Sequence, residues 1–123
     1  MILTTDETLI RSILEDETVI DGFSDGKRIE NLDIGIYFYE PDVGLFPVNL
    51  KGNAVCVHAA IPKKNRGLKA LEAAKWLANV LCLKYDVFTQ VRHNREHVKR
   101  FVKMVGFTHL YDTDTHHFYR YIK

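Results

Sequence analysis

The chain has 123 residues, a formal net charge of +1 and a hydrophobic content of 46%. This length fits one domain with one hydrophobic core, and we expect a single domain over residues 1–123. The near-zero net charge argues against nucleic acid as the main partner, because binding to a phosphate polymer depends on many cationic contacts. The composition is that of a globular protein, so we expect no membrane partner either.

The two cysteines indicate a reducing compartment. Cys56 and Cys82 each lie inside an apolar stretch, and the sequence has no Cys-x-x-Cys pair. Small secreted domains usually carry a dense, even-numbered set of cysteines. The first residues include acidic side chains and no long apolar core, unlike a signal peptide or a membrane span. The sequence therefore predicts a cytoplasmic protein.

The N-terminal half predicts one helix followed by three strands. Thr4 and Glu7 have the spacing of a capping box, so we expect a helix over residues 5–15 that is capped by Thr4. Alternating apolar residues predict a strand over 32–38, and short apolar runs predict strands over 45–50 and 54–61. Pro47 predicts an irregular or edge position for the second strand, because proline has no N–H for a ladder.

The C-terminal half predicts two helices and three strands. Apolar residues at helical spacing predict helices over 68–81 and over 98–105, the second ending at Gly106. Strands are expected over 86–92, 107–111 and 116–122. A meander followed by a strand–helix–strand unit predicts the α+β class, with a single mixed, mostly antiparallel sheet and helices on both faces.

A cation-rich turn connects the 54–61 strand to the 68–81 helix, in the stretch "IPKKNRGLKALEAA" (61–74). Lys63, Lys64, Arg66 and Lys69 lie around the expected start of the helix, and Gly67 leaves room for a close approach to the backbone. The first turn of a helix has unpaired N–H groups and the positive end of the helix dipole. The pattern favours a pyrophosphate ligand, and a solvated turn is the structural alternative.

Two segments resemble the GNAT superfamily of acyl-CoA N-acyltransferases. "RHNREHVKRFVKMVGF" (92–107) is similar to the region where an Asn after a strand opens a helix that ends in Gly-Phe, and "HAAIPKKNRGLKALEAA" (58–74) is similar to the strand and pyrophosphate-binding turn. The predicted order of elements is also that of the superfamily. The resemblance implies that acetyl-CoA lies in a cleft between two splayed parallel strands, which contain Ala59–Ile61 and Phe88–Val91.

The resemblance also implies which residues hold the coenzyme. Backbone groups near Ala60 and Ile61 would pair with the pantetheine arm, and Asn94 would contact that arm or hold the following helix. The amides of the turn would surround the pyrophosphate. The full set is Ala60, Ile61, Lys63, Lys64, Asn65, Arg66, Gly67, Leu68, Lys69, Ala70 and Asn94.

Acetyl transfer to an amine needs a base for the proton of the amine and an acid for the departing thiolate. His58 is the preferred base, because an imidazole has an unperturbed pKa of about 6.5. Glu40 and Asp42 are substitute bases, and Tyr111 and His97 are candidate acids. A hydrogen-bonded, half-buried His58 is the structural alternative.

Three histidines near the C-terminus raise the question of a metal ion. Adjacent residues of a strand point to opposite faces, so His116 and His117 cannot face one ion without a bulge. His109 does not form a His-x-His pair with either of the other two histidines, and no cysteine lies nearby in the sequence. We therefore expect no metal site.

These observations predict an N-acetyltransferase that moves the acetyl group of acetyl-CoA to an amine by direct attack. The acceptor, a small amine or a group on a partner protein, would lie over the N-terminal helix and residues 16–31. We expect a monomer or a homodimer.

The rival hypothesis is a protein of the same fold without catalysis. The helix pattern "H-x-x-R-F-x-K-x-x-G" resembles short phage-encoded proteins, some with a structural role in virion or head assembly, and a host-interaction role is the other possibility. Lys69 occupies a position where the superfamily has a small residue. Val102 occupies the position of the tyrosine that often acts as the general acid in the superfamily. Both features favour the rival. The matching residues are His97, Arg100, Phe101, Lys103 and Gly106.

Overall fold

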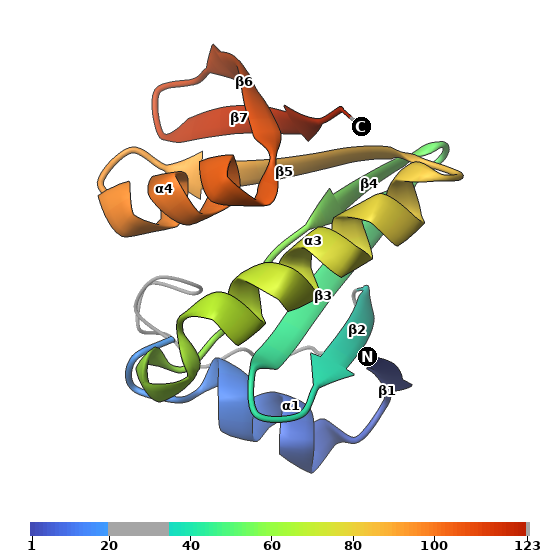
Figure 1. The fold of residues 1–123 in the computed structure, drawn as a ribbon, viewed down its shortest axis with the longest axis vertical. Helices are drawn as coiled ribbons and strands as arrows, with labels where there is room; N and C mark the ends of the chain where they lie inside the picture. The colour runs from blue at the N-terminus through green and yellow to red at the C-terminus, as the bar shows by residue number, and fades with distance from the viewer. Residues whose placement is uncertain (20–34, 123) are drawn as a thin grey trace.

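One mixed sheet of seven strands forms the centre of the computed structural model, which describes residues 1–19 and 35–122 (Figure 1). The strand order is β1-β2-β3-β4-β5-β7-β6, and β4 and β5 form the parallel pair in an otherwise antiparallel sheet. The strands are β1 (Ile2–Thr4), β2 (Ile36–Glu40), β3 (Gly44–Lys51), β4 (Ala54–Val57), β5 (Asp86–Arg92), β6 (Phe107–Asp112) and β7 (His116–Tyr121). The predicted α+β class and mixed sheet are confirmed.

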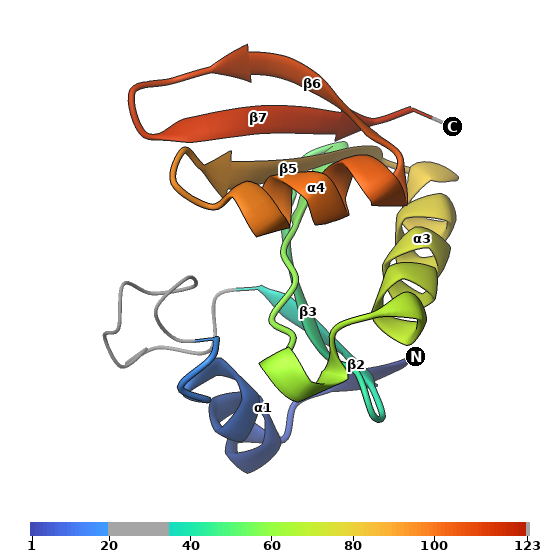
Figure 2. The same ribbon diagram turned by 60° about the vertical axis from the view of Figure 1, so that its left-hand side comes forward.

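Helices cover both faces of the sheet, as predicted. Helix α1 (Glu7–Leu14) packs against Tyr37 and Leu45 on one face. Consecutive strand residues alternate between faces, so Phe46 points to the face opposite to that of Leu45. Helix α3 (Leu68–Cys82) packs against Phe46 on that opposite face. Helix α4 (Glu96–Val105) lies across β5 on the same side as α3 and contacts Val91 (Figure 2). A short 3-10 helix, η1 (Lys63–Asn65), precedes α3.

The N-terminal elements differ from the prediction in two ways. Ile2–Thr4 forms the edge strand β1, which the sequence analysis did not predict because three residues are too few for a periodic pattern. The cap of α1 is Asp6 and not Thr4: the Asp6 carboxylate accepts the N–H groups of Thr8 and Leu9 at 3.1 and 3.2 Å. Thr4 instead accepts the N–H of Asp6 at its hydroxyl.

The predicted strand over 32–38 is observed only in part. Its observed portion belongs to β2, while residues 32–34 lie outside the described residues.

The sequence predicts an irregular or edge position for Pro47, and the edge position is wrong. Its strand, β3, lies inside the sheet between β2 and β4. The carbonyl of Pro47 accepts the N–H of His58 at 2.8 Å, whereas Pro47 has no N–H to complete the second bond of that antiparallel pair. Two residues on, Leu45 and Ala60 exchange both bonds, at 3.0 and 2.8 Å. A proline is tolerated here because β4 ends at Val57, four residues before the predicted end at Ile61.

None of the described helices is long and apolar enough to cross a membrane.

Gly44 permits the close contact between β3 and the segment after β4, and we predict that Gly44→Ala destabilises the fold by about 1–3 kcal/mol. An added Cβ would lie 2.5 Å from the carbonyl oxygen of Ala60, which is backbone and cannot rotate away. The free energy of unfolding, from urea titrations followed by circular dichroism, measures the effect. Gly52→Asn is the matched control, because its Cβ meets no atom within 4 Å and Asn tolerates the φ of 60°. Equal stability of Gly44→Ala and wild type would contradict the steric argument.

Candidate functional site

The parallel strands β4 and β5 pair over three residues and then separate. Their register joins Ala54 to Asp86, Val55 to Val87 and Cys56 to Phe88. At the next position the hydroxyl of Thr89 donates to the carbonyl of Val57 at 2.7 Å. Beyond this bond β5 continues to Arg92 alongside β7, while β4 has ended. The sheet therefore opens between its two parallel strands.

A cavity of about 1260 Å³ fills this opening and extends between α3 and α4. Its lining includes Thr89 and Val91 together with Gln90 and Arg92. Consecutive side chains of a strand point to opposite faces, so a cavity lined by all four passes through the plane of the sheet. A ligand on the face covered by α3 and α4 can thus come close to a group on the opposite face.

The interior of the cavity is apolar, and its charged lining is mostly basic. Phe46, Leu71 and Phe101 contribute apolar walls. Glu17 is the one carboxylate among the described residues that line it. The basic lining residues are Arg66, Arg92, Arg95 and Arg100. Such a lining favours a ligand with an apolar body and a negatively charged end.

Three of these arginines lie close enough to affect one histidine. Burial lowers the pKa of His97, and the positive charges of Arg66, Arg95 and Arg100 lower it further. Arg66 comes from the turn before α3, Arg95 is the N-cap of α4, and Arg100 lies in the middle of α4. Two separate parts of the chain therefore bring positive charge to the same cavity.

The N-terminus of α3 opens toward this cavity. Gly67 is the N-cap, and no side chain caps the helix. Gly67 and Leu68 both line the cavity, and a Cβ at Gly67 would meet no atom within 4 Å. An anion can bind here, because the N–H groups of the first turn donate to it and the positive end of the helix dipole attracts it.

Part of the cation-rich turn has a structural role. Arg66 donates from Nε to the carbonyl of Ile61 at 3.1 Å and from Nη2 to the carbonyl of Thr18 at 2.9 Å. Asn65 donates from its side-chain amide to the carbonyl of Val43 at 3.1 Å. These bonds fix the turn against the β2–β3 connection and the segment after α1. Arg66 therefore both holds the turn in place and contributes positive charge to the cavity.

The other predicted coenzyme residues divide into two groups. Ile61, like Arg66, Gly67 and Leu68, lines the cavity. Outside its lining, Lys63, Lys64 and Lys69 are exposed, Ala70 is buried in the core, and Asn94 is exposed in the turn between β5 and α4. Ala60 uses both backbone groups in its pair with Leu45, and it is the preceding residue, Ala59, that lines the cavity.

His58 lies at the end of β4 and lines the cavity. Its Nε2 is 3.5 Å from the sulfur of Cys56. Burial lowers the pKa of His58, and the charge of His116 lowers it further, so the imidazole is neutral at pH 7 and can accept a proton. Burial raises the pKa of the Cys56 thiol, so this cysteine is protonated at neutral pH.

Among the other predicted catalytic residues, His97 shares the lining of the main cavity with His58, and Tyr111 shares that of a smaller cavity. Glu40 contacts the N-terminal amine of Met1 at 3.3 Å, and neither Glu40 nor Asp42 lines the cavity. Tyr111 stacks on Phe118 and borders a smaller cavity of about 370 Å³ that also touches His58.

Sequence reasoning missed two residues of the site. His116 lines the main cavity, but its sequence context suggested only the metal question. Thr89 is the one buried polar side chain among the described residues, and its place inside the apolar stretch "DVFTQV" was a signal that could have been followed. Its partner on β4 could not be named without the register of the strands.

We predict that Thr89→Val destabilises the protein by about 1–3 kcal/mol, because the substitution keeps the shape of the side chain and removes the donor to a part-buried carbonyl. Thr89→Ser keeps the hydroxyl and is the matched control. Urea unfolding of the three proteins measures the difference. If Ser and Val destabilise equally, the lost methyl or β-branching matters and the hydrogen bond does not.

We predict that His58 titrates below its usual pKa of 6.5 in the folded protein. Since the folded-state pKa is depressed, protonation favours the unfolded state: the contribution of His58 to stability is full above about pH 6.5 and falls as the pH drops through the folded-state value. NMR titration of the imidazole gives the pKa directly. The unfolding free energy of wild type should also fall more steeply with acid than that of His58→Gln, and parallel pH profiles would contradict the prediction.

Comparison of the chain with protein-family models, with curated proteins and with solved structures finds no match. Its function therefore has to be argued from the site itself.

Proposed function

We propose that the protein binds acetyl-CoA in the cavity between β4 and β5 and transfers the acetyl group to an amine by direct attack. The observation that carries the proposal is the separation of the two parallel strands over a cavity with an apolar interior and a basic rim. A pantetheine arm is an extended chain with amide groups, and such chains pair well with the edges of separated strands.

The charged residues fit the phosphate groups of the coenzyme. Arg66, Arg95 and Arg100 line the cavity and lower the pKa of His97, and the start of α3, which no side chain caps, lines the same cavity. Backbone N–H groups and guanidinium groups are the donors that proteins use for phosphates. Since part of Arg66 is bound to backbone carbonyls, Arg100 would take a larger share of the phosphate contacts.

His58 fits the role of the base. Acetyl-CoA supplies the activated acetyl thioester. The neutral imidazole of His58 accepts a proton from the attacking amine, and its place at the end of β4 puts it beside the opening in the sheet. His116 also lines the cavity and is the available donor toward the departing thiolate. His97 lies near the arginines that fit the phosphates, and the pantetheine arm separates these from the thioester. These features support the same function that the resemblance to the GNAT superfamily implies.

We predict that Arg100→Glu weakens binding of acetyl-CoA at least about tenfold, because it replaces a cavity-lining cation with an anion. Lys103→Glu is the matched control: it makes the same charge change on the same helix at an exposed residue that does not line the cavity. Titration calorimetry measures both affinities. Dephospho-CoA should bind more weakly than the full coenzyme, while desulfo-CoA should retain most of the affinity.

Acetyl transfer is tested separately by the release of free thiol in the presence of a panel of amines. His58→Gln should slow this release and leave the affinity for acetyl-CoA unchanged. Equal loss of affinity in Arg100→Glu and Lys103→Glu would place the coenzyme outside the cavity. The absence of binding at millimolar coenzyme would overturn the proposal and favour the rival, a non-catalytic protein with a structural or host-interaction role.

A further inference from the structure

The β6–β7 hairpin brings two histidines and an aspartate to one face of the sheet. His109 lies opposite Tyr119, and Asp112 lies opposite His117. Residues 109 and 112 are three apart, so regular alternation would place them on opposite faces. A bulge between His109 and Tyr111 shifts the register by one residue and puts both side chains on the same face as His117.

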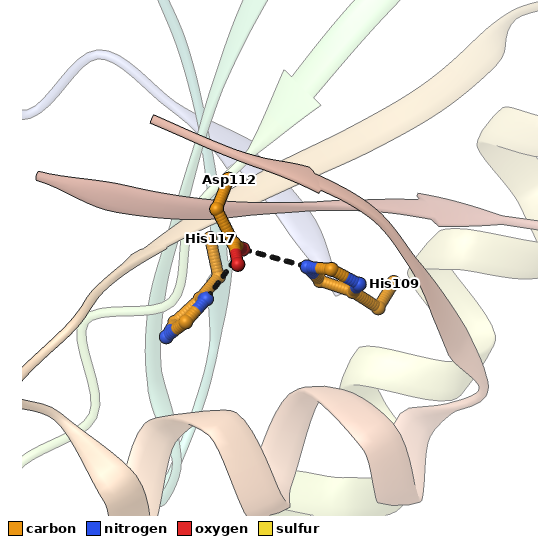
Figure 3. A group of neighbouring side chains, drawn as sticks. All are labelled: His109, Asp112 and His117. Atoms are coloured by element: carbon orange, nitrogen blue, oxygen red, sulfur yellow. Dashed lines mark hydrogen bonds and ion pairs between the residues drawn. The ribbon is translucent and has the colours of Figure 1, made fainter. Parts of the chain in front are cut away.

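The three side chains converge on one point (Figure 3). Asp112 Oδ1 lies 2.6 Å from His109 Nε2 and 2.5 Å from His117 Nδ1. One potential ligand atom from each residue lies within 4.8 Å of the other two. The bonds from His109 and His117 hold the pKa of Asp112 at about 2, so the carboxylate is ionised at neutral pH.

A neighbouring ring contacts each imidazole: the buried Tyr119 beside His109 and the exposed His93 beside His117. The ring of His109 packs edge-on against Tyr119, which is 1% exposed, with 5.5 Å between the ring centroids. The ring of His117 packs edge-on against His93 at 4.1 Å, and His93 Nε2 donates to the carbonyl of Thr113 at 2.7 Å. The potential ligands are therefore oriented before any ion binds.

The group is also open to solvent on one side. The side chains of His109 and Asp112 are 44% and 45% exposed, while that of His117 is 14% exposed. An ion can reach the three ligand atoms from the surface, and water can complete its coordination.

We propose that His109, Asp112 and His117 form a binding site for a divalent transition-metal ion, with Zn²⁺ the ion that the ligand set fits best. Two imidazole nitrogens and one carboxylate oxygen, with a water as the fourth ligand, make a usual tetrahedral Zn²⁺ environment. Mg²⁺ and Ca²⁺ prefer oxygen ligands and should bind weakly. The ion takes the place of the two N–H protons that Asp112 now accepts, so each ring carries its proton on the other nitrogen when the metal is bound.

This site revises the expectation of no metal. The sequence argument correctly separated His116 from His117, but it could not foresee the bulge that unites His109 with Asp112. None of the three residues lines the main cavity, so the metal site is independent of the proposed acetyl transfer.

Calorimetric titration of the full chain with Zn²⁺ tests the proposal. We predict one bound ion and at least about a tenfold loss of affinity in His117→Gln. His116→Gln is the matched control, because it changes the neighbouring residue on β7, which points to the opposite face, and should leave the affinity unchanged. Mg²⁺ in place of Zn²⁺ should give no comparable binding.

NMR of the wild-type imidazoles gives a second readout that does not depend on a variant folding. Zn²⁺ should shift the resonances of His109 and His117 and move the ring protons to Nδ1 of His109 and Nε2 of His117. Binding that His116→Gln abolishes and His117→Gln preserves would overturn the proposal and point to the Cys56–His58 side of the sheet. Unchanged His109 and His117 resonances in excess Zn²⁺ would show that the group is a hydrogen-bonded cluster only.

Discussion

The hydrogen bond from the Thr89 hydroxyl to the Val57 carbonyl marks the point on which the architecture of the site depends. On one side of β4, Pro47 lacks the N–H that would complete its pair with His58. On the other side, the parallel ladder stops at Cys56 and Phe88, and a side chain supplies the last link. Both neighbours of β4 thus limit its length, and the sheet opens where β4 ends. Helices α3 and α4 then pack on the same face of a sheet whose strands have separated, and the cavity lies between them.

The turn before α3 shows how one side chain can support the fold and the site together. Burial lowers the pKa of His97, and Arg66, Arg95 and Arg100 lower it further because their positive charges repel another positive charge at this position. Two backbone carbonyls offset part of this repulsion by accepting hydrogen bonds from Arg66. A bound anion would offset the rest, so this arrangement of positive charges favours a phosphate ligand. The lysine side chains of the turn, in contrast, are exposed and do not line the cavity, although the backbone N–H of Lys63 donates to the hydroxyl of Thr18 at 2.9 Å.

Much of the fold follows from local patterns in the sequence, and its departures have non-local causes. The apolar spacing in α3 and α4 and the alternation in β5 are local, and these elements were predicted closely. The interior position of Pro47 depends on where β4 ends, which no pattern within β3 records. The same division applies to the candidate site. Arg66 and Gly67 both line the main cavity, and they could be considered together because the turn is continuous in sequence. Glu40 and Tyr111 do not line that cavity, because their side-chain directions depend on the order and pairing of distant strands.

Strand β7 shows how far such dependence can go. His116 and His117 are adjacent, yet one lines the cavity and the other bonds to Asp112 on the opposite face. The second contact exists only because the bulge in β6 adds one residue before Tyr111. A regular β6 would keep His109 opposite Tyr119 and turn Asp112 to the other face, leaving two histidines without their shared carboxylate. The cluster is therefore a property of the hairpin register, and the residue types that compose it would be unremarkable in any other alignment of the two strands.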